Sequence, residues 1–196
     1  MEMQTLEKLL VNSRLWNFFH ARFNLSRVFT MIAGDPGPVV LELGCGAGFT
    51  TGEILKRFPN VRVLAIDYDV KQVEAVRQRL VPFGKRVSVQ QGDATALAVP
   101  MASVDTVFEF NAFHHIREWG KALDEVQRVL KPGGTFYAMD TSRHFTMMPV
   151  IRALSEGFFT KEEFIQRLGT SGLRVRQATG DGLVFYLAAE NVQSPR

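Results

Sequence analysis

The sequence contains a single cysteine, Cys45, among its 196 residues. One cysteine cannot form an internal disulfide bond or supply a metal–thiolate cluster. No apolar run approaches the roughly 20 residues that a membrane-spanning helix needs. Residues 1–10 also lack the basic segment and long apolar core of a signal peptide. We therefore expect a cytoplasmic protein without a metal site.

The sequence also has little excess charge and no basic cluster. Its 23 Lys and Arg residues against 20 Asp and Glu residues give a net charge of +3, and the basic residues are spread along the chain. This charge alone gives little support to a nucleic-acid partner, and we expect none. The length fits a single domain, 1–196, with an N-terminal helical cap (1–34), a core (35–140) and a C-terminal segment with the final strands (141–196).

Short β-branched runs alternate with helical patterns from residue 39 onward, as in a parallel sheet with crossover helices. The predicted strands are residues 39–43, 61–66, 86–90, 104–110, 135–139, 173–177 and 183–188. Only residues 178–182 separate the last two strands, which is too short for a crossover helix. We predict a Rossmann-like, doubly wound α/β fold with seven strands, mostly parallel with one antiparallel strand at the C-terminus, preceded by N-terminal helices over residues 5–32.

Two helix starts carry recognisable capping residues. Asp69 precedes a helical pattern with Gln72 at its third position, and residues 160–163, Thr-Lys-Glu-Glu, form a capping box for a short helix that ends at Gly169. Both patterns predict where a helix begins.

Alternating glycines follow the first predicted strand in the segment Gly44-Cys45-Gly46-Ala47-Gly48. Glycine lets the backbone turn sharply and approach a ligand closely, and the next helix offers its N-terminal amides. A dinucleotide-binding loop would have its third glycine at Phe49, where an aromatic argues against that reading. We interpret Cys45 as a small filler residue of the loop, because no base is near it in sequence. A glycine-rich turn without function is the alternative.

Acidic residues end the next two strands. Asp67 ends the second strand, where its carboxylate can accept both hydroxyl protons of an adenosine ribose. Asp69 already explains the helix cap, so we favour the ribose role. Tyr68 would lie beside the adenine, or else pack as a buried aromatic against the core. Asp93 ends the third strand and can accept from the adenine amino group, with a turn aspartate as the alternative.

Taken together, these stretches resemble the class I S-adenosylmethionine-dependent methyltransferases, near the branch of small-molecule enzymes that includes the quinone and sterol C-methyltransferases. The resemblance covers residues 35–140, the expected cofactor-binding core. It is carried by residues 39–48, 65–69, 92–97 and 130–134, with further likeness at 103–107 and 114–116.

The resemblance implies S-adenosyl-L-methionine as cofactor. It implies that the glycine loop borders the methionine portion, that Asp67 holds the ribose and that Asn111 lies near the transferable methyl group. The cofactor-binding residues so expected are Glu42, Gly44, Cys45, Gly46, Gly48, Asp67, Tyr68, Asp93, Ala94 and Asn111.

Acceptors such as phenols, acidic carbons and protonated amines need a base that removes a proton. His114 and His115 follow the fourth strand on the binding side and are the candidate catalytic residues, with polar contacts at a helix start as the alternative. Residues 111–113, Asn-Ala-Phe, lack both prolines of the (Asp/Asn)-Pro-Pro-aromatic motif of amino-directed nucleic-acid methyltransferases. Methylation of a base amino group is therefore disfavoured.

Two segments lie outside the motifs that carry the family resemblance and are rich in apolar residues. They suggest a hydrophobic small-molecule acceptor, drawn from a membrane surface. These residues are Trp16, Phe18, Phe19, Phe23, Phe145, Met147, Met148, Ile151, Leu154, Phe158 and Phe159. An apolar lid over the acceptor is one interpretation, and ordinary packing of helices on the sheet is the other. A non-catalytic S-adenosylmethionine- or nucleoside-binding regulatory module and a protein or RNA methyltransferase stay open as alternative functions.

Overall fold

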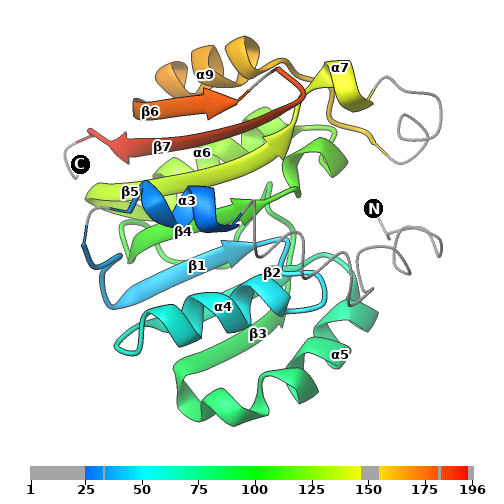
Figure 1. Cartoon of the computed structure of the whole chain (residues 1–196), viewed down its shortest axis with the longest axis vertical. Coiled ribbons are helices and arrows are strands. Elements are labelled where there is room, and N and C mark those ends of the chain that lie inside the picture. The colour runs from blue at the N-terminus through cyan, green and yellow to red at the C-terminus, as the bar shows by residue number, and fades with distance from the viewer. Residues whose placement is uncertain (1–24, 33, 147–154, 181, 194–196) are drawn as a thin grey trace.

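A seven-stranded sheet runs through the structure, a computed structural model that describes residues 25–32, 34–146, 155–180 and 182–193 (Figure 1). The strand order is β3-β2-β1-β4-β5-β7-β6. The strands are β1 (Val39–Leu43), β2 (Arg62–Asp67), β3 (Val87–Gln91), β4 (Val104–Phe110), β5 (Leu130–Thr141), β6 (Leu173–Gly180) and β7 (Val184–Asn191). Strands β1 to β5 pair in parallel, and β7 runs antiparallel to its neighbours. The predicted fold class is confirmed.

The antiparallel strand is last along the chain but not last across the sheet. β7 inserts between β5 and β6, so the edge strand is β6 (Figure 1). β5 also begins at Leu130, five residues before the predicted start at residue 135. Leu130 pairs with Val104 before a register shift, so the Lys-Pro-Gly-Gly segment 131–134 lies within the strand rather than in a turn ahead of it.

Helices cover both faces of the sheet (Figure 1). On one face lie α3 (Ser26–Thr30), α4 (Phe49–Arg57) and α5 (Val70–Arg79), and on the other lie α6 (Trp119–Val129) and α9 (Lys161–Thr170). Short elements complete the fold: η2 (Val81–Arg86), η3 (Phe113–His115) and α7 (Arg143–Thr146). Within the described ranges, no helix combines the length and the apolar character needed to cross a membrane.

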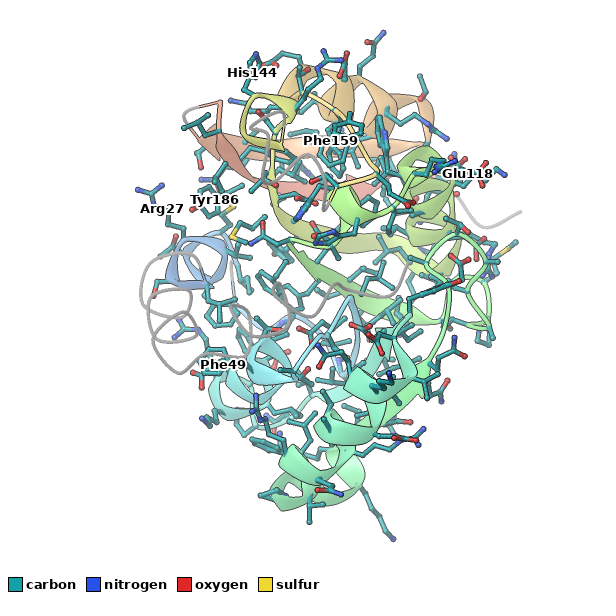
Figure 2. The ribbon with its side chains drawn as sticks, turned by 90° about the vertical axis from the view of Figure 1, so that its right-hand side faces the viewer. Arg27, Phe49, Glu118, His144, Phe159 and Tyr186 are labelled. Atoms are coloured by element: carbon teal, nitrogen blue, oxygen red, sulfur yellow. The ribbon has the colours of Figure 1, made fainter. Side chains whose placement is uncertain are left out.

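The predicted helix starts are confirmed at α5 and α9. The Asp69 carboxylate caps α5 by accepting from the Lys71 amide at 2.9 Å. Thr160 and Glu163 form the capping box of α9, with the hydroxyl accepting from one amide and the carboxylate from the other. Of the helix predicted over residues 5–32, the structure describes only the end, where α3 forms, and Arg27 of α3 lies over the Tyr186 ring of β7 (Figure 2).

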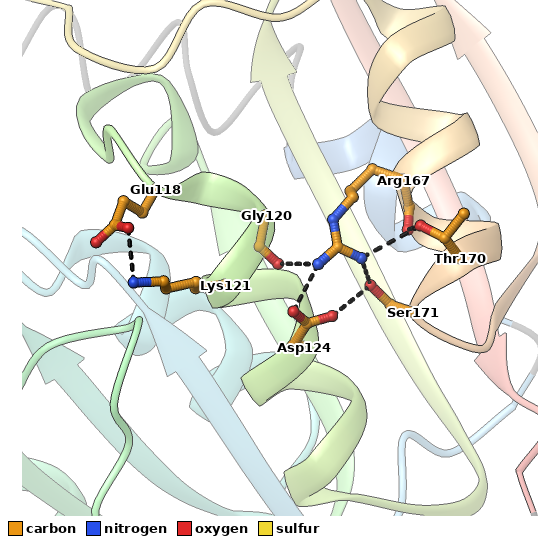
Figure 3. Close-up of polar contacts among 7 residues, drawn as sticks. All are labelled: Glu118, Gly120, Lys121, Asp124, Arg167, Thr170 and Ser171. Atoms are coloured by element: carbon orange, nitrogen blue, oxygen red, sulfur yellow. Dashed lines mark hydrogen bonds and ion pairs between the residues drawn. The ribbon is translucent and has the colours of Figure 1, made fainter.

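A polar network fixes α9 against α6 (Figure 3). The Arg167 guanidinium donates to the carbonyl of Gly120 at 2.9 Å and to the Asp124 carboxylate at 2.5 Å. Asp124 accepts in turn from the Ser171 hydroxyl at 2.9 Å. Below this network, one face of the sheet buries an aromatic cluster made of Phe113, Trp119, Phe136, Phe159, Phe164 and Phe185. α9 is thereby held at a fixed place against α6 and β6.

Candidate active site

The strand order reverses at β1, which lies between β2 and β4. In sheets of this kind, ligands bind beyond the carboxyl ends of the strands at that reversal. The glycine loop, the turn after β2 and the turn after β4 all start from these ends. Two contacts bring them together, because Gly46 donates to Asp67 and Gly44 packs against Ala112.

Two loop glycines have different reasons to be glycine. Gly44 has φ 68°, and a Cβ there would lie 2.4 Å from the Cβ of Ala112, so a side chain would collide with the turn after β4. Gly46 has φ 48°, but a Cβ there would meet no atom of the described residues within 4 Å. None of the described residues therefore blocks the approach of a ligand to the Gly46 backbone. Phe49 is the first residue of α4, so the helix lacks the glycine that a dinucleotide-binding loop would place there.

Asp67 holds the glycine loop to the end of β2. One carboxylate oxygen accepts from the Gly46 amide at 2.7 Å and the other from the Asp69 amide at 2.9 Å. Burial raises the pKa of Asp67, while these amides and the charge of His115 act in the opposite direction. A carboxylate has about four acceptor sites, so each Asp67 oxygen can take one more proton donor. Two neighbouring ribose hydroxyls match this capacity.

Glu42 lies beneath the loop, with only 1% of its surface exposed. Its carboxylate oxygens accept from the hydroxyls of Thr50 and Thr51, the latter at 2.5 Å, and so fix the first turn of α4. Burial raises the pKa of Glu42 to about 7, with a further increase from the charge of Asp67. The buried Cys45 thiol also has a raised pKa, chiefly through burial, which supports its interpretation as a filler rather than a nucleophile.

The residues expected around the adenine lie at the ends of β2 and β3. Tyr68 is 49% exposed, so the alternative of a buried core aromatic is wrong. Asp93 is exposed, and one of its oxygens accepts from the amide and hydroxyl of Thr95 at 2.8 Å and 2.7 Å. Asp93 therefore does act as a turn aspartate, and its adenine contact stays a prediction, as does that of the partly buried Ala94.

Asn111 follows β4 with φ 58°, a left-handed conformation that asparagine tolerates better than most residues. Its backbone amide donates to the carbonyl of Met139 at 2.8 Å. Its side-chain Oδ1 is buried, and no partner for it is found among the described residues. Buried acceptors are rarely left without a donor. This oxygen, the open space at Gly46 and the acceptor capacity of Asp67 fit a nucleoside that carries an amino acid.

The two predicted histidines lie in η3, immediately beyond Asn111. The Nδ1 atom of His114 lies 2.5 Å from the carboxylate of Asp140, and His114 is 8% exposed. Its ring centroid lies 3.9 Å from that of His115. The structure thus ties His114 to the end of β5, with the His115 ring beside it.

Two acidic residues that the sequence analysis missed lie behind His114. Glu109 of β4 and Asp140 of β5 are both completely buried. Burial, and then the charge of Asp140, raise the pKa of Glu109 well above its usual range. Carboxylic acids are almost never fully buried without partners. The sequence signal for Glu109 and Asp140 was an acidic residue in or at the end of an apolar run, Phe-Glu-Phe in β4 and Ala-Met-Asp in β5.

The residues expected to form an apolar lid lie largely outside the described residues. That holds for Trp16, Phe18, Phe19, Phe23, Met147, Met148, Ile151 and Leu154. Phe159 is described and belongs to the buried aromatic cluster, so ordinary packing is the correct interpretation for this residue. Phe158 is 36% exposed. Exposed His144 lies at the top of Figure 2, well above Phe49, and its ring contacts the Ser142 hydroxyl at 3.3 Å.

The chain is similar to known methyltransferases. Residues 40–134 match the family described as a methyltransferase domain. A probable S-adenosylmethionine-dependent methyltransferase from Mycolicibacterium smegmatis is 34% identical over 74% of this chain and 55% of its own length. A demethylmenaquinone methyltransferase from Symbiobacterium thermophilum is 29% identical over the same shares. A tRNA N(3)-methylcytidine methyltransferase from Schizosaccharomyces pombe is 30% identical over 74% of this chain and 48% of its own.

The chain spans about half the length of these curated relatives. Solved structures match it more completely. A methyltransferase from Aquifex aeolicus superposes with a TM-score of 0.79 at 23% identity, covering 97% of this chain and 100% of the other. A putative methyltransferase of Haloferax volcanii, solved with its Trm112 activator, gives a TM-score of 0.81 at 16% identity over 98% and 100%. Residues 40–134 belong to this methyltransferase family, and the chain has the fold of the class I S-adenosylmethionine-dependent methyltransferases.

Proposed function

We propose that this protein transfers a methyl group from S-adenosylmethionine to a small-molecule acceptor. The proposal rests on one observation: three groups that can bind a ligand lie together at the carboxyl ends of β1, β2 and β4. These are the open backbone at Gly46, the Asp67 carboxylate with one acceptor site left on each oxygen, and the buried Oδ1 of Asn111.

In this proposal Asp67 holds the ribose hydroxyls and Asn111 accepts from the amino group of the methionine portion. The glycine loop borders the same portion, with Glu42 and Cys45 beneath it. When bound, the cofactor supplies a methyl group attached to a cationic sulfur, and the sulfur becomes a neutral thioether once the methyl group is transferred. The protein's own task is to align the acceptor and exclude water, which can lower a barrier by about 7–11 kcal/mol. His114 or His115 takes the acceptor's proton where one must leave.

A small acceptor is favoured over a nucleic acid by two observations. The chain lacks a basic cluster, and the turn after β4 reads Asn-Ala-Phe, without the prolines of the amino-directed nucleic-acid enzymes. Relatives named for both acceptor types, demethylmenaquinone and tRNA, match this chain. An acceptor of the quinone or phenol kind would also fit the hydrophobic acceptor that the sequence suggests.

Titration calorimetry with S-adenosylmethionine and its demethylated product tests cofactor binding. Asp67→Ala should weaken the affinity at least tenfold, because two charge-assisted hydrogen bonds to the ribose are lost. Glu74→Ala, on the exposed side of α5, is the matched control and should leave affinity unchanged. An unaltered dissociation constant for Asp67→Ala would remove the ribose assignment.

Methyl release to a panel of phenols, quinones, amines and unmodified tRNA then identifies the acceptor class. We expect transfer to a small molecule and none to tRNA. Transfer to tRNA alone would replace the proposed acceptor class. Tight cofactor binding with no transfer to any acceptor in the panel would favour a regulatory module over an enzyme.

A further inference from the structure

A buried cluster of two carboxyl groups and an imidazole lies at the carboxyl ends of β4 and β5. Glu109 pairs in register with Ala138, so Asp140, two residues further along β5, points to the same face of the sheet as Glu109. His114 reaches this cluster from η3, with Nδ1 2.5 Å from Oδ1 of Asp140. Only 11% of the His114 side chain is exposed, and none of the Asp140 side chain is.

Hydrogen-bond donors are distributed unequally between the two carboxyl groups. Asp140 accepts from the backbone amides of Phe113, His114 and Thr141 at 2.9, 3.2 and 2.6 Å, in addition to the imidazole. Oε1 of Glu109 accepts from the amide of Ala112 at 2.5 Å, and no described donor reaches its Oε2. The Phe113 amide and the Asp140 side chain are the other hydrogen-bonding neighbours of Glu109.

This inequality decides which carboxyl group carries the charge. Donors that point at a carboxylate stabilise its ionised form, and a second carboxylate beside it favours protonation of the poorer site. Burial and the charge of Asp140 both raise the pKa of Glu109. The donors at Asp140 and the raised pKa of Glu109 therefore favour Glu109 as the carboxyl group that holds the proton of the pair.

We propose that Asp140, with neutral Glu109 behind it, is a positioning residue that holds His114 in the Nδ1–H tautomer, so that Nε2 is the proton acceptor of the active site. A carboxylate beside Nδ1 requires a proton on that nitrogen, and the neutral ring then has its free lone pair on Nε2. The assignment selects His114, whose Nδ1 faces the Asp140 carboxylate, over His115, whose ring lies beside that of His114.

This assignment rests on the proposed function and names the acceptor chemistry that the site serves. The acceptor must carry an acidic O–H, N–H or C–H bond. Its proton moves to Nε2, which forms a new N–H bond, and the electron pair of the broken bond stays on the acceptor atom that takes the methyl group. The imidazolium so formed keeps its Nδ1–H bond to Asp140 and later loses the Nε2 proton to solvent.

Nitrogen-15 NMR of histidine-labelled protein tests the tautomer without any methyl transfer. At a pH where the rings are neutral, wild-type His114 should show a protonated Nδ1 and an unprotonated Nε2. Asp140→Asn should invert this pattern, because the amide offers an N–H toward Nδ1 where the carboxylate offered a lone pair. His144→Asn, at an exposed ring on α7, removes one resonance and should leave the His114 tautomer as in wild type.

The same variants are then compared kinetically once an acceptor is known. Asp140→Asn should lower kcat at least a hundredfold, the range in which proton removal contributes, while the affinity for cofactor changes less than threefold. A wild-type His114 protonated on Nε2, or an Asp140→Asn variant that keeps the wild-type tautomer, would overturn the assignment. If the tautomer is as expected but no acceptor is methylated, the proposed function fails and the positioning by Asp140 stands.

Discussion

Two sites with buried carboxyl groups lie at the carboxyl ends of the central strands but on opposite faces of the sheet. Glu42 extends from β1 toward α4, next to the residues that pack under α4 and α5. Glu109 and Asp140 extend from β4 and β5 toward the face that α6 and α9 cover. Glu42 has two neutral hydroxyl donors, whereas Asp140 has three backbone amides and an imidazole.

The difference shows that burial alone does not decide how a carboxyl group ionises. Glu42 and Glu109 are equally buried, and burial is the largest cause of the raised pKa in both. For Glu42, two hydroxyls lower the pKa, and the value stays near 7. For Glu109, a neighbouring carboxylate raises the pKa further. The pKa of Glu42 thus lies near neutral pH, while the pKa of Glu109 is raised further by the second carboxyl group beside it.

Removal of the Asp140 carboxylate should have the largest effect on stability. Asp140→Ala leaves three backbone amides and the His114 ring without their acceptor in a buried site. Each unsatisfied buried donor costs about 1–3 kcal/mol, and partial rearrangement brings the expected loss to about 3–5 kcal/mol of unfolding free energy. Urea denaturation measures it. Asp140→Asn, which keeps one acceptor oxygen, should lose less than half as much, and equal losses would contradict this account of the donors.

The sequence predicts the half of the site that is local in the chain. β1 and β4 begin and end where their patterns predict, because a buried central strand is a continuous apolar run with clear ends. The place of Asp67 beside the glycine loop is not local in the chain, but it follows from the rule that the carboxyl ends of neighbouring parallel strands meet. Asp69 and Thr160 cap their helices because capping depends on neighbours two or three residues away.

The other half of the site consists of residues whose contacts cannot be inferred from sequence patterns. Glu109 and Asp140 are 31 positions apart, and only the register of β4 with β5 places them on one face. Each appears in the sequence as a single acid in an apolar strand. The early start of β5 at Leu130 was missed for a related reason, since Pro132 and Gly133 indicate a turn unless a neighbouring strand extends the pairing.

Glu42 should make stability fall as the pH rises toward neutral. Its pKa is about 7 in the folded protein and 4.5 in the unfolded chain, so between these values the folded state holds a proton that the unfolded state has lost. The contribution is complete below pH 4.5 and is lost as the pH rises through 7. It amounts to about 3 kcal/mol from the two pKa values.

Glu42→Gln isolates this contribution, because glutamine has a similar shape and does not titrate. The difference in unfolding free energy between wild type and variant, measured by urea denaturation at pH 5 and pH 8, should change by about 3 kcal/mol in favour of the variant at pH 8. Other titrating groups cancel in this difference. Parallel pH profiles for the two proteins would show that Glu42 ionises normally despite its burial.

Thr51→Val should have the smallest effect, and it tests how much one hydrogen-bond donor changes the ionisation of Glu42. The Thr51 hydroxyl donates to Glu42 at 2.5 Å and lowers the pKa of the carboxyl, and valine keeps the shape without the donor. A hydrogen bond to a charged group contributes about 1.5–3 kcal/mol, against about 1 kcal/mol for a neutral pair. Thr51→Val should therefore lose about 2 kcal/mol at pH 8, and less at pH 5, where Glu42 is protonated.

Thr51→Ser retains the hydroxyl and is the control. A Thr51→Val loss that is equal at both pH values would mean that the hydroxyl stabilises the neutral acid as well as the carboxylate, and the donors at Glu42 would then no longer explain why its pKa stays near 7.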